Sequence, residues 1–415
     1  MNGKAHALRI EPQPWMIEPA TQGVLAALAE GGAEARFVGG SVRDALLGRP
    51  IGDIDIATPA PPDRVIELLQ KRRIKVVPTG IAHGTVTAIA GSPPRHFEIT
   101  TLRRDVETYG RRARVAFDAD WEADAARRDF TINAISLDPD GTVHDAVGGL
   151  ADLQARRVRF VGDPATRIAE DVLRILRYYR FEARFGGGLG DSQARAACRV
   201  MAVLLFNLSG ERVAQELVRL LGTADPARAL QMMAEDGVLV VVLPEARRLD
   251  RLRNLTEIEP EPDAVRRLAA LVDVDRAGAI ALAERLRFAN PVRDRLGGLT
   301  PPWGIDPSAD IIAQRRALYR LGAERYRDIA LLLAAEGAMS RQRPGELLML
   351  ANAWTPPAFP TSGRDVTALG VPPGPRVGEL LDAVREWWEA RDFGADREAC
   401  LAQLRKLLAA EEQTS

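Results

Sequence analysis

One stretch, Phe37 to Thr58 (FVGGSVRDALLGRPIGDIDIAT), constrains the fold and the chemistry of this chain more than any other. It opens with an apolar pair, turns at Gly39-Gly40, and continues with apolar residues at helical spacing as far as Gly48. Residues 51–56 then alternate between apolar and polar side chains, which is typical of a strand. The stretch therefore predicts a strand, a tight turn, a helix and a second strand, in that order.

The second strand carries two carboxylates, Asp53 and Asp55, which alternation places together on the face opposite Ile54 and Ile56. Two neighbouring carboxylates repel each other unless a cation lies between them. Their hard oxygens suit Mg²⁺, which binds one or two carboxylates and completes its shell with substrate phosphates. An isolated Asp-x-Asp would be better interpreted as a solvated strand end, but here it follows a glycine turn within one unit.

The glycine turn itself favours a nucleotide. Gly39 and Gly40 allow a ligand to approach the backbone closely, and the N–H groups of a helix that begins at Ser41 would face an anion. Arg43 adds a cation one residue beyond Val42. Turn, cation and carboxylates together predict a site for a triphosphate and a metal ion.

Three further segments, near residues 74–77, 85–89 and 96–102, are rich in β-branched residues and predict strands. In the last of them Glu98 lies on the face opposite Phe97 and Ile99. Glu98 is therefore a candidate third carboxylate on a strand that could lie beside the Asp53/Asp55 strand. A solvent-facing glutamate is an equally good interpretation.

The segment Arg127 to Ile135 (RRDFTINAI) places polar groups among apolar ones. Arg128, Asp129 and Asn133 alternate with aromatic and aliphatic residues, so we expect them at the edge of a core, where each needs a hydrogen-bond partner. A purely structural network is the plainer alternative to a binding role.

Further along, Asp163 and Gly186 bracket a sequence with continuous helical periodicity (RIAEDVLRILRYYRFEARF), which predicts one long helix. Asp171 and Arg174 lie three residues apart and would meet on its surface as an ordinary ion pair. A later helix carries Arg212 and Glu216, which could brace the long helix, although solvated side chains are the more usual outcome.

Composition bounds the class of protein. The chain has 415 residues, enough for two to four domains, and no apolar run approaches a membrane span. Cys198 and Cys400 are isolated, and the N-terminal residues lack an apolar core, so we expect no secretory signal and a cytoplasmic protein. The net charge is −1, so a nucleic-acid surface would have to be a local patch.

Taken in order, the three motifs resemble those of the class II tRNA nucleotidyltransferases, the CCA-adding enzymes, within the DNA polymerase beta-like nucleotidyltransferases. The resemblance is specific through the first half of the chain and weak beyond about residue 225. It implies an α+β fold in which a catalytic head is followed by an all-helical neck, body and tail. The expected domains are a head at 20–150, a neck at 151–224, a body at 225–345 and a tail at 346–415 that contacts tRNA.

The resemblance also implies roles for the residues of the motifs. Asp53 and Asp55 would bind Mg²⁺, and both would be catalytic together with Glu98. Asp171 and Arg174 would replace a nucleic-acid template, and Arg128 and Asp129 would hold the ribose and the phosphates. The full set of nucleotide-binding candidates is Gly39, Gly40, Ser41, Arg43, Arg128, Asp129, Asn133, Asp171, Arg174, Arg177 and Arg180.

The reaction implied by the resemblance is the addition of C, C and A to the 3′ end of tRNA, with CTP and ATP as substrates and pyrophosphate as the leaving group. The charged segment from Arg103 to Trp121 matches a mobile loop that the family needs for the final A. A bacterial poly(A) polymerase, which shares the head and neck, and a catalytically inactive RNA-binding module are the alternatives. Residues 225–415 contain no histidine, which excludes an HD-type phosphohydrolase domain there.

Overall fold

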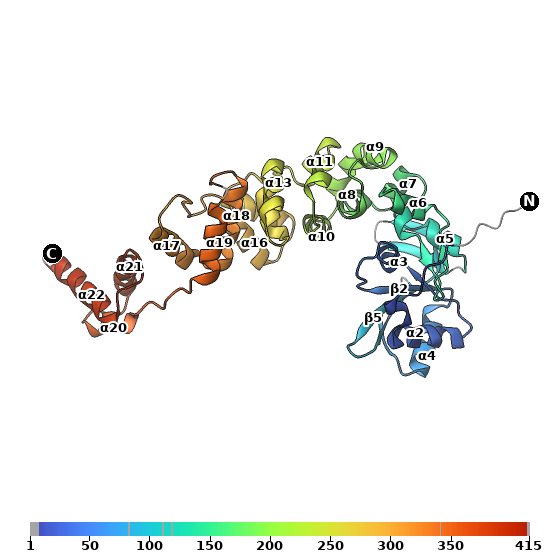
Figure 1. Ribbon diagram of the computed structural model, residues 1–415, viewed down its shortest axis with the longest axis horizontal. Helices are drawn as coiled ribbons and strands as arrows, with labels where there is room; N and C mark the ends of the chain where they lie inside the picture. The colour runs from blue at the N-terminus through green and yellow to red at the C-terminus, as the bar shows by residue number, and fades with distance from the viewer. Residues whose placement is uncertain (1–7, 82–83, 110–111, 118, 341, 413–415) are drawn as a thin grey trace, which may run out of the picture. The chain divides into compact units, whose positions relative to one another are not determined.

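The computed structural model describes residues 8–81, 84–109, 112–117, 119–340 and 342–412, which form the expected α+β fold (Figure 1). The chain divides into two compact units, Met1–Pro244 and Glu245–Ser415. Within the described residues the strands all lie in the first unit, and the second is built from helices. None of the helices in these ranges is long and apolar enough to cross a membrane. The finer division into head, neck, body and tail stays a prediction.

A seven-stranded sheet forms the centre of the N-terminal part of the first unit, with the strand order β3-β4-β5-β2-β1-β8-β9. The central pair, β2 and β5, runs parallel, and the other pairs are antiparallel. The sheet therefore brings the strand of Asp55 beside the strand of Glu98, which is one of the two alternatives that the sequence left open. The strands are β1 (Arg36–Val38), β2 (Ile54–Thr58), β3 (Lys75–Gly80), β4 (Thr85–Ala90), β5 (Arg95–Thr101), β8 (Ser136–Leu137) and β9 (Val143–His144).

Alternating burial fixes the orientation of the two central strands. Ile54 and Ile56 on β2 and Phe97 and Ile99 on β5 are each no more than 1% exposed. Helices α2 and α4 pack against each other and against β4, and α3 packs against β1 and β2. The elements of this part are α1 (Pro14–Ile17), α2 (Pro19–Glu30), α3 (Gly40–Leu46), α4 (Pro62–Lys71), α5 (Trp121–Ala126), the 3-10 helix η2 (Thr131–Asn133) and α6 (Gly149–Gln154).

The charged segment after β5 has a regular structure where we expected a loop. Strands β6 (Arg103–Tyr109) and β7 (Arg112–Phe117) form a separate two-stranded antiparallel sheet, with Arg103 opposite Phe117 and Tyr109 opposite Arg112. Residues 110–111, between the two strands, lie outside the described residues. The segment is therefore a hairpin that pairs within itself and adds no strand to the main sheet.

The prediction of one long helix between Asp163 and Gly186 was wrong. The structure has two helices, α7 (Pro164–Glu170) and α8 (Arg174–Phe185), separated at Asp171, whose backbone is extended with φ −151° and ψ 107°. The Asp171 side chain accepts a hydrogen bond from the N–H of Leu173 at 3.1 Å. Aspartate can bond its own local backbone in this way and so compete with the helical pattern, which apolar periodicity does not reveal.

The remaining helices of the first unit pack around α8, which contacts α10 and α11, while α7 contacts α9. Aromatic rings also connect α8 to the preceding part of the unit. Phe181 on α8 lies 4.9 Å from Phe130, and Phe130 lies 4.9 Å from Phe160, each measured between ring centroids. These contacts make the sheet and α8 one packed body. The helices are α9 (Ser192–Met201), the 3-10 helix η3 (Ala202–Asn207), α10 (Gly210–Leu221), α11 (Ala227–Glu235) and α12 (Leu239–Val242).

The second unit is helical, as predicted. Near its C-terminal end Trp388 is 1% exposed and packs with Val366, Leu380 and Leu404 in an apolar core. Its helices are α13 (Leu249–Ile258), α14 (Ala264–Leu271), α15 (Arg276–Arg285), α16 (Asn290–Gly298), α17 (Ile311–Leu321), α18 (Ala323–Ala335), α19 (Arg343–Ala353), α20 (Gly363–Ala368), α21 (Pro375–Glu389) and α22 (Arg397–Glu412).

Candidate active site

Four carboxylates line one pocket at the start of β2, and three of them are the candidates Asp53, Asp55 and Glu98. Asp55 on β2 lies directly opposite Glu98 in the parallel register with β5, and Asp53 comes immediately before β2. Asp53 and Glu98 are exposed and Asp55 is half-buried. The pocket has a volume of about 550 Å³, and its lining residues are Gly40, Ser41, Asp44, Pro50, Ile51, Gly52, Asp53, Asp55, Glu98 and Arg184. We call it the acidic pocket.

The glycine turn is shaped around Asp55. Gly39 has φ +71°, and a Cβ atom there would lie 3.1 Å from a carboxylate oxygen of Asp55. The N–H of Gly40 donates to the same carboxylate. Ser41, which also lines the pocket, donates its hydroxyl to the carbonyl oxygen of Val38 at 3.0 Å. The backbone thus fixes the position of Asp55, and a side chain at Gly39 would disturb it.

The electrostatics of Asp55 indicate a site prepared for a cation. Burial and the negative charge of Glu98 raise the pKa of Asp55 to about 6, from an ordinary value of 3.8, and Asp53 adds to this effect. The charge of Arg128 and the hydrogen bond from Gly40 oppose it without cancelling it. A carboxylate with a raised pKa beside two others favours any positive charge that enters the pocket.

A buried chain of hydrogen bonds links α3 to α8 through the RRDFTINA motif. Arg43 donates to the Asn133 side-chain oxygen at 2.6 Å, and the Asn133 amide donates to Asp129 at 3.0 Å. Arg177 then donates to the other oxygen of Asp129 at 2.9 Å. Burial opposes ionisation of Asp129, but the charge of Arg177 and these hydrogen bonds hold its pKa below the usual value. Four candidates from three motifs therefore lie in one network.

Arg128 stands beside this network and reaches toward the turn. It forms an ion pair with Asp124 at 3.1 Å, and its guanidinium lies 3.5 Å from the position a Cβ of Gly39 would occupy. Its charge also acts on Asp55. Arg128 thus connects the second motif to the acidic pocket.

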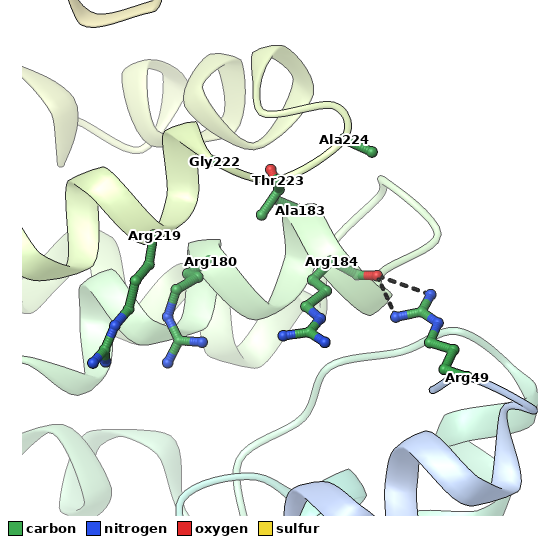
Figure 2. A pocket seen from close by; sticks show the side chains of 8 residues that line it. All are labelled: Arg49, Arg180, Ala183, Arg184, Arg219, Gly222, Thr223 and Ala224. Atoms are coloured by element: carbon green, nitrogen blue, oxygen red, sulfur yellow. Dashed lines mark hydrogen bonds between the residues drawn. The ribbon is translucent and has the colours of Figure 1, made fainter. Parts of the chain in front are cut away.

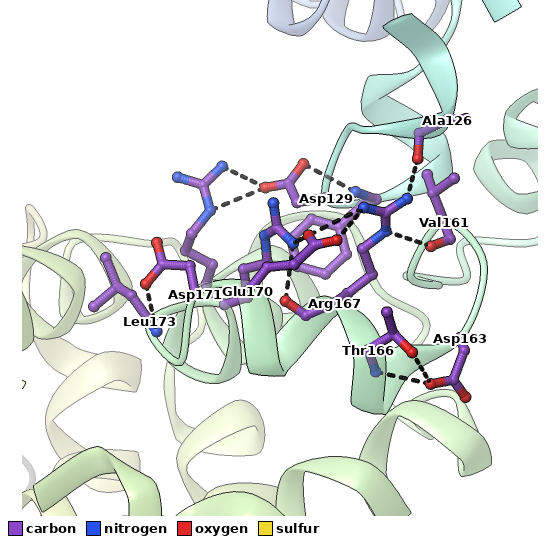
Figure 3. A network of polar contacts seen from close by, with 12 residues as sticks. Ala126, Asp129, Val161, Asp163, Thr166, Arg167, Glu170, Asp171 and Leu173 are labelled. Atoms are coloured by element: carbon purple, nitrogen blue, oxygen red, sulfur yellow. Dashed lines mark hydrogen bonds and ion pairs between the residues drawn. The ribbon is translucent and has the colours of Figure 1, made fainter. Parts of the chain in front are cut away.

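Asp171 and Arg174 do not form the ion pair that we expected. Asp171 instead accepts two hydrogen bonds from Arg212 of α10, at 2.9 and 2.8 Å. Arg174 pairs with Glu170 and donates to the carbonyl oxygen of Arg167 at 2.8 Å. The reason is the break at Asp171, which removes the helical i, i+3 geometry. Figure 3 shows Glu170, Asp171 and Asp129 within one polar network at this end of α8.

Of the two alternatives for Arg212 and Glu216, the structure shows the bracing contacts and not the solvated side chains that are the more usual outcome. Arg212 holds Asp171, and Glu216, only 3% exposed, accepts a hydrogen bond from Arg180 at 2.6 Å. The first contact joins α10 to the break before α8 and the second joins α10 to α8, and neither could be inferred from periodicity. Glu170 was missed as well, although its position four residues before Arg174 suits an ion pair.

The candidates on and just before α8, Asp171, Arg174, Arg177 and Arg180, do not line the acidic pocket. Arg180 lines a second pocket together with Arg49, Arg184 and Arg219. Arg184, which no motif suggested, lines both pockets. The structure thus brings the carboxylates and the turn together and joins Arg177 to the RRDFTINA motif through Asp129, while Asp171, Arg174 and Arg180 lie outside the acidic pocket.

Comparison with known proteins places this geometry in context. Residues 35–159 match the family described as Poly A polymerase head domain, and residues 191–249 match the one described as Probable RNA and SrmB- binding site of polymerase A. The first match contains the turn, the three carboxylates and the RRDFTINA motif.

Relatives match over most of the chain. The CCA tRNA nucleotidyltransferase 1, mitochondrial, of Danio rerio is 33% identical over 387 residues, covering 89% of this chain and 87% of the relative. The CCA-adding enzyme of Geobacillus stearothermophilus is 34% identical over 384 residues, covering 89% and 91%. The crystal structure of Bacillus stearothermophilus CCA-adding enzyme in complex with CTP superposes with a TM-score of 0.81 at 30% identity, covering 96% of this chain and all of that one.

Proposed function

The chain belongs to the family of CCA-adding tRNA nucleotidyltransferases, and from this premise we propose that the acidic pocket is where it extends the 3′ end of tRNA. The enzyme adds C, C and A stepwise with CTP and ATP, without a nucleic-acid template, and releases pyrophosphate. In each step the 3′-oxygen of the RNA forms a bond to the α-phosphorus. The bond between the α-phosphorus and the oxygen that bridges it to the β-phosphate breaks, which releases pyrophosphate, and a base accepts the proton of the 3′-hydroxyl.

The observation that carries the assignment of the site is the parallel register of Asp55 with Glu98, beside Asp53 and the glycine turn. Hard carboxylate oxygens around a pocket suit Mg²⁺. Among the residues that the structure describes, no group of three or more His, Cys, Asp or Glu side chains is arranged to hold a metal ion, so the proposal relies on Asp53 and Asp55 together with substrate phosphate oxygens. When bound at Asp53 and Asp55, Mg²⁺ would neutralise charge on the reacting phosphate and lower the pKa of the attacking hydroxyl.

The chain's own groups then have separate tasks. Glu98, exposed and opposite Asp55, is placed to accept the proton of the RNA 3′-hydroxyl or to assist at the metal. Arg128 directs its charge toward the turn, where a triphosphate would enter between Gly39, Gly40, Ser41 and Arg43. Asp129, held by Asn133 and Arg177, is the candidate partner of the ribose 2′-hydroxyl.

Base choice is assigned to Asp171 and Arg174. Cytosine and adenine each present an amine donor beside a ring-nitrogen acceptor, which an accepting carboxylate and a donating guanidinium match. Uracil and guanine present the opposite order. Arg212 and Glu170 hold the two side chains by separate contacts, so each remains in place without depending on the other.

Two broader features complete the proposal. The head at 20–150 would bind the reacting nucleotide, and the neck at 151–224 would read its base. The body at 225–345 would follow, and the tail at 346–415 would contact tRNA. A cytoplasmic location is supported by the two cysteines, Cys198 and Cys400, which are both free and buried.

One assay tests the function against its alternatives. The protein is incubated with tRNA that lacks its CCA end and with labelled CTP or ATP, and Asp55→Asn serves as the inactive control. Two C followed by one A supports a CCA-adding enzyme. A long A tract would instead identify a poly(A) polymerase, and tRNA binding without any extension would identify an inactive RNA-binding module.

A further inference from the structure

A second pocket in the first unit is lined by four arginines and lies outside the acidic pocket. Its volume is about 730 Å³. Arg180 and Arg184 come from α8, Arg219 comes from α10, and Arg49 comes from the connection between α3 and β2. Figure 2 shows the guanidinium groups of Arg219, Arg180 and Arg184 side by side, extending to the same side of their helices. We call it the arginine pocket.

The charges of the arginine pocket are only partly neutralised. Arg180 and Arg219 share one carboxylate, Glu216, at 2.6 and 3.5 Å. Arg184 lies 3.5 Å from Asp44, which already pairs with Arg43 at 3.0 Å. None of the described residues that line the pocket is an aspartate or a glutamate. The pocket therefore retains an excess of positive charge that favours an anionic ligand.

The arrangement of these groups identifies the form of the anion. The side chains of Arg219 and Arg184 are 61% and 50% exposed, so a ligand can reach them from solvent. Arg180 and Arg184 are one helical turn apart on α8, and Arg219 extends the row from the neighbouring helix. A row of guanidinium groups suits successive phosphates of a strand, which bind arginine through charge-assisted hydrogen bonds.

The location links this row to the reaction. Arg184 lines both pockets, so the two pockets are neighbours that share this side chain. Arg49 donates to the carbonyl oxygen of Arg184 at 3.3 Å, which ties the connection before β2 to α8 at this boundary. A strand whose 3′ end lies beside Asp53 and Asp55 could therefore place its preceding phosphates along the arginines.

We propose that the arginine pocket binds backbone phosphates of the single-stranded 3′ end of the RNA primer. This rests on the proposed function and adds to it the path of the RNA strand next to the reacting end. The contacts are to phosphate, so they position the strand without reading its bases. The triphosphate is the rival ligand, but its reacting phosphate must lie at Asp53 and Asp55 in the acidic pocket, which Arg49, Arg180 and Arg219 do not line.

The test uses Arg49→Ala, Arg219→Ala and the double variant, with Arg49→Lys and Arg219→Lys as conservative versions. Arg64→Ala is the matched control, because Arg64 is a partly exposed arginine on α4 that pairs with Glu67 and lines neither pocket. Steady-state kinetics on tRNA that lacks CCA give kcat, the KM for tRNA and the KM for CTP at several salt concentrations.

We expect each alanine variant to raise the KM for tRNA roughly three- to tenfold and to leave the KM for CTP unchanged. The dependence of log KM on log salt should become shallower by about 0.7 for each single-strand phosphate contact that is lost. The lysine variants should recover most of the affinity, because a point charge still attracts phosphate. Arg64→Ala should behave as the parent.

Two results would overturn the inference. A raised KM for CTP or weaker inhibition by pyrophosphate, with an unchanged KM for tRNA, would assign the pocket to the triphosphate. A lower melting temperature without any change in the kinetic constants would make the arginines structural. If the parent protein extends no tRNA, the proposed function fails, and fluorescence anisotropy with tRNA ending in a 3′-deoxynucleotide still measures whether the alanine variants bind RNA more weakly.

Discussion

We expect the Asp55 carboxylate to destabilise the folded protein although catalysis needs it, and replacing it with asparagine separates these two effects. The carboxylate is held between Glu98, Asp53 and the glycine turn, and its pKa is raised to about 6. Asn has the same shape, keeps an oxygen for the N–H of Gly40 and adds a donor that can face Glu98. We therefore expect Asp55→Asn to abolish nucleotide transfer while making the metal-free protein more stable at neutral pH.

The magnitude follows from the pKa. A folded-state value of about 6 against an ordinary 3.8 means that the native state holds its proton more tightly than the unfolded chain. Stability therefore falls as pH rises from about 4 to 6, and the full penalty remains above pH 6. A difference of about two in pKa corresponds to an upper limit of about 3 kcal/mol. For a unit of this size, that is a melting-temperature gain of roughly 5–10 °C in the variant.

The assay is thermal unfolding of parent and variant between pH 4 and 8, with a chelator present. The difference between the two proteins should grow from about pH 4 to pH 6 and then stay constant. Added Mg²⁺ should stabilise the parent and close part of the gap. Asp294→Asn, a change at an exposed aspartate of the second unit, is the control and should show no such pH-dependent gain. Equal pH profiles for parent and Asp55→Asn would refute the electrostatic account of the pocket.

Three further predictions test other parts of the site. Asp53→Ala should abolish transfer and leave tRNA binding nearly unchanged in a filter-binding assay, because the proposed role of the lost group is to hold metal and not RNA; substantial residual transfer would contradict the metal assignment. Arg212→Ala should lower discrimination against UTP by roughly 3- to 30-fold in single-nucleotide kinetics, because Asp171 loses its partner, whereas unchanged selectivity would make Arg212 merely structural. Shortening residues 104–114 of the β6–β7 hairpin should preserve CC addition and impair the final A in a gel assay of products; an equal loss of all three additions would indicate a general folding role.

Sequence reasoning identified the acidic pocket because the relevant pattern is local. Alternation in residues 51–56 fixed the faces of β2, and the β-branched segment around Glu98 predicted its neighbouring strand. The pairing of the two strands is not local, because α4, β3 and β4 lie between them in the chain, and only the structure shows the register that sets Asp55 directly opposite Glu98. The seven-stranded sheet and the helical second unit also agree with the predicted α+β fold.

The neck was predicted less well because its geometry depends on tertiary contacts. Apolar periodicity runs unbroken through Asp171, so it could not reveal that the aspartate bonds its own backbone and ends α7. The contact between Arg212 and Asp171 spans 41 residues and requires α10 to pack on α8. Arg184 and the arginine pocket likewise arise only from that packing, because no motif marks Arg49, Arg184 or Arg219.

The proposed role of the side chains at the break between α7 and α8 is to read the incoming base. Its most direct test compares the parent with the double variant Asp171→Ala/Arg174→Ala on tRNA ending in the discriminator base, with one nucleotide supplied at a time. Each unpaired polar group costs about 1–3 kcal/mol, so the parent should reject UTP and GTP by roughly a hundredfold or more. We predict that the double variant uses CTP and ATP less efficiently and loses this discrimination. A double variant that rejects UTP and GTP as firmly as the parent would show that the base is read elsewhere.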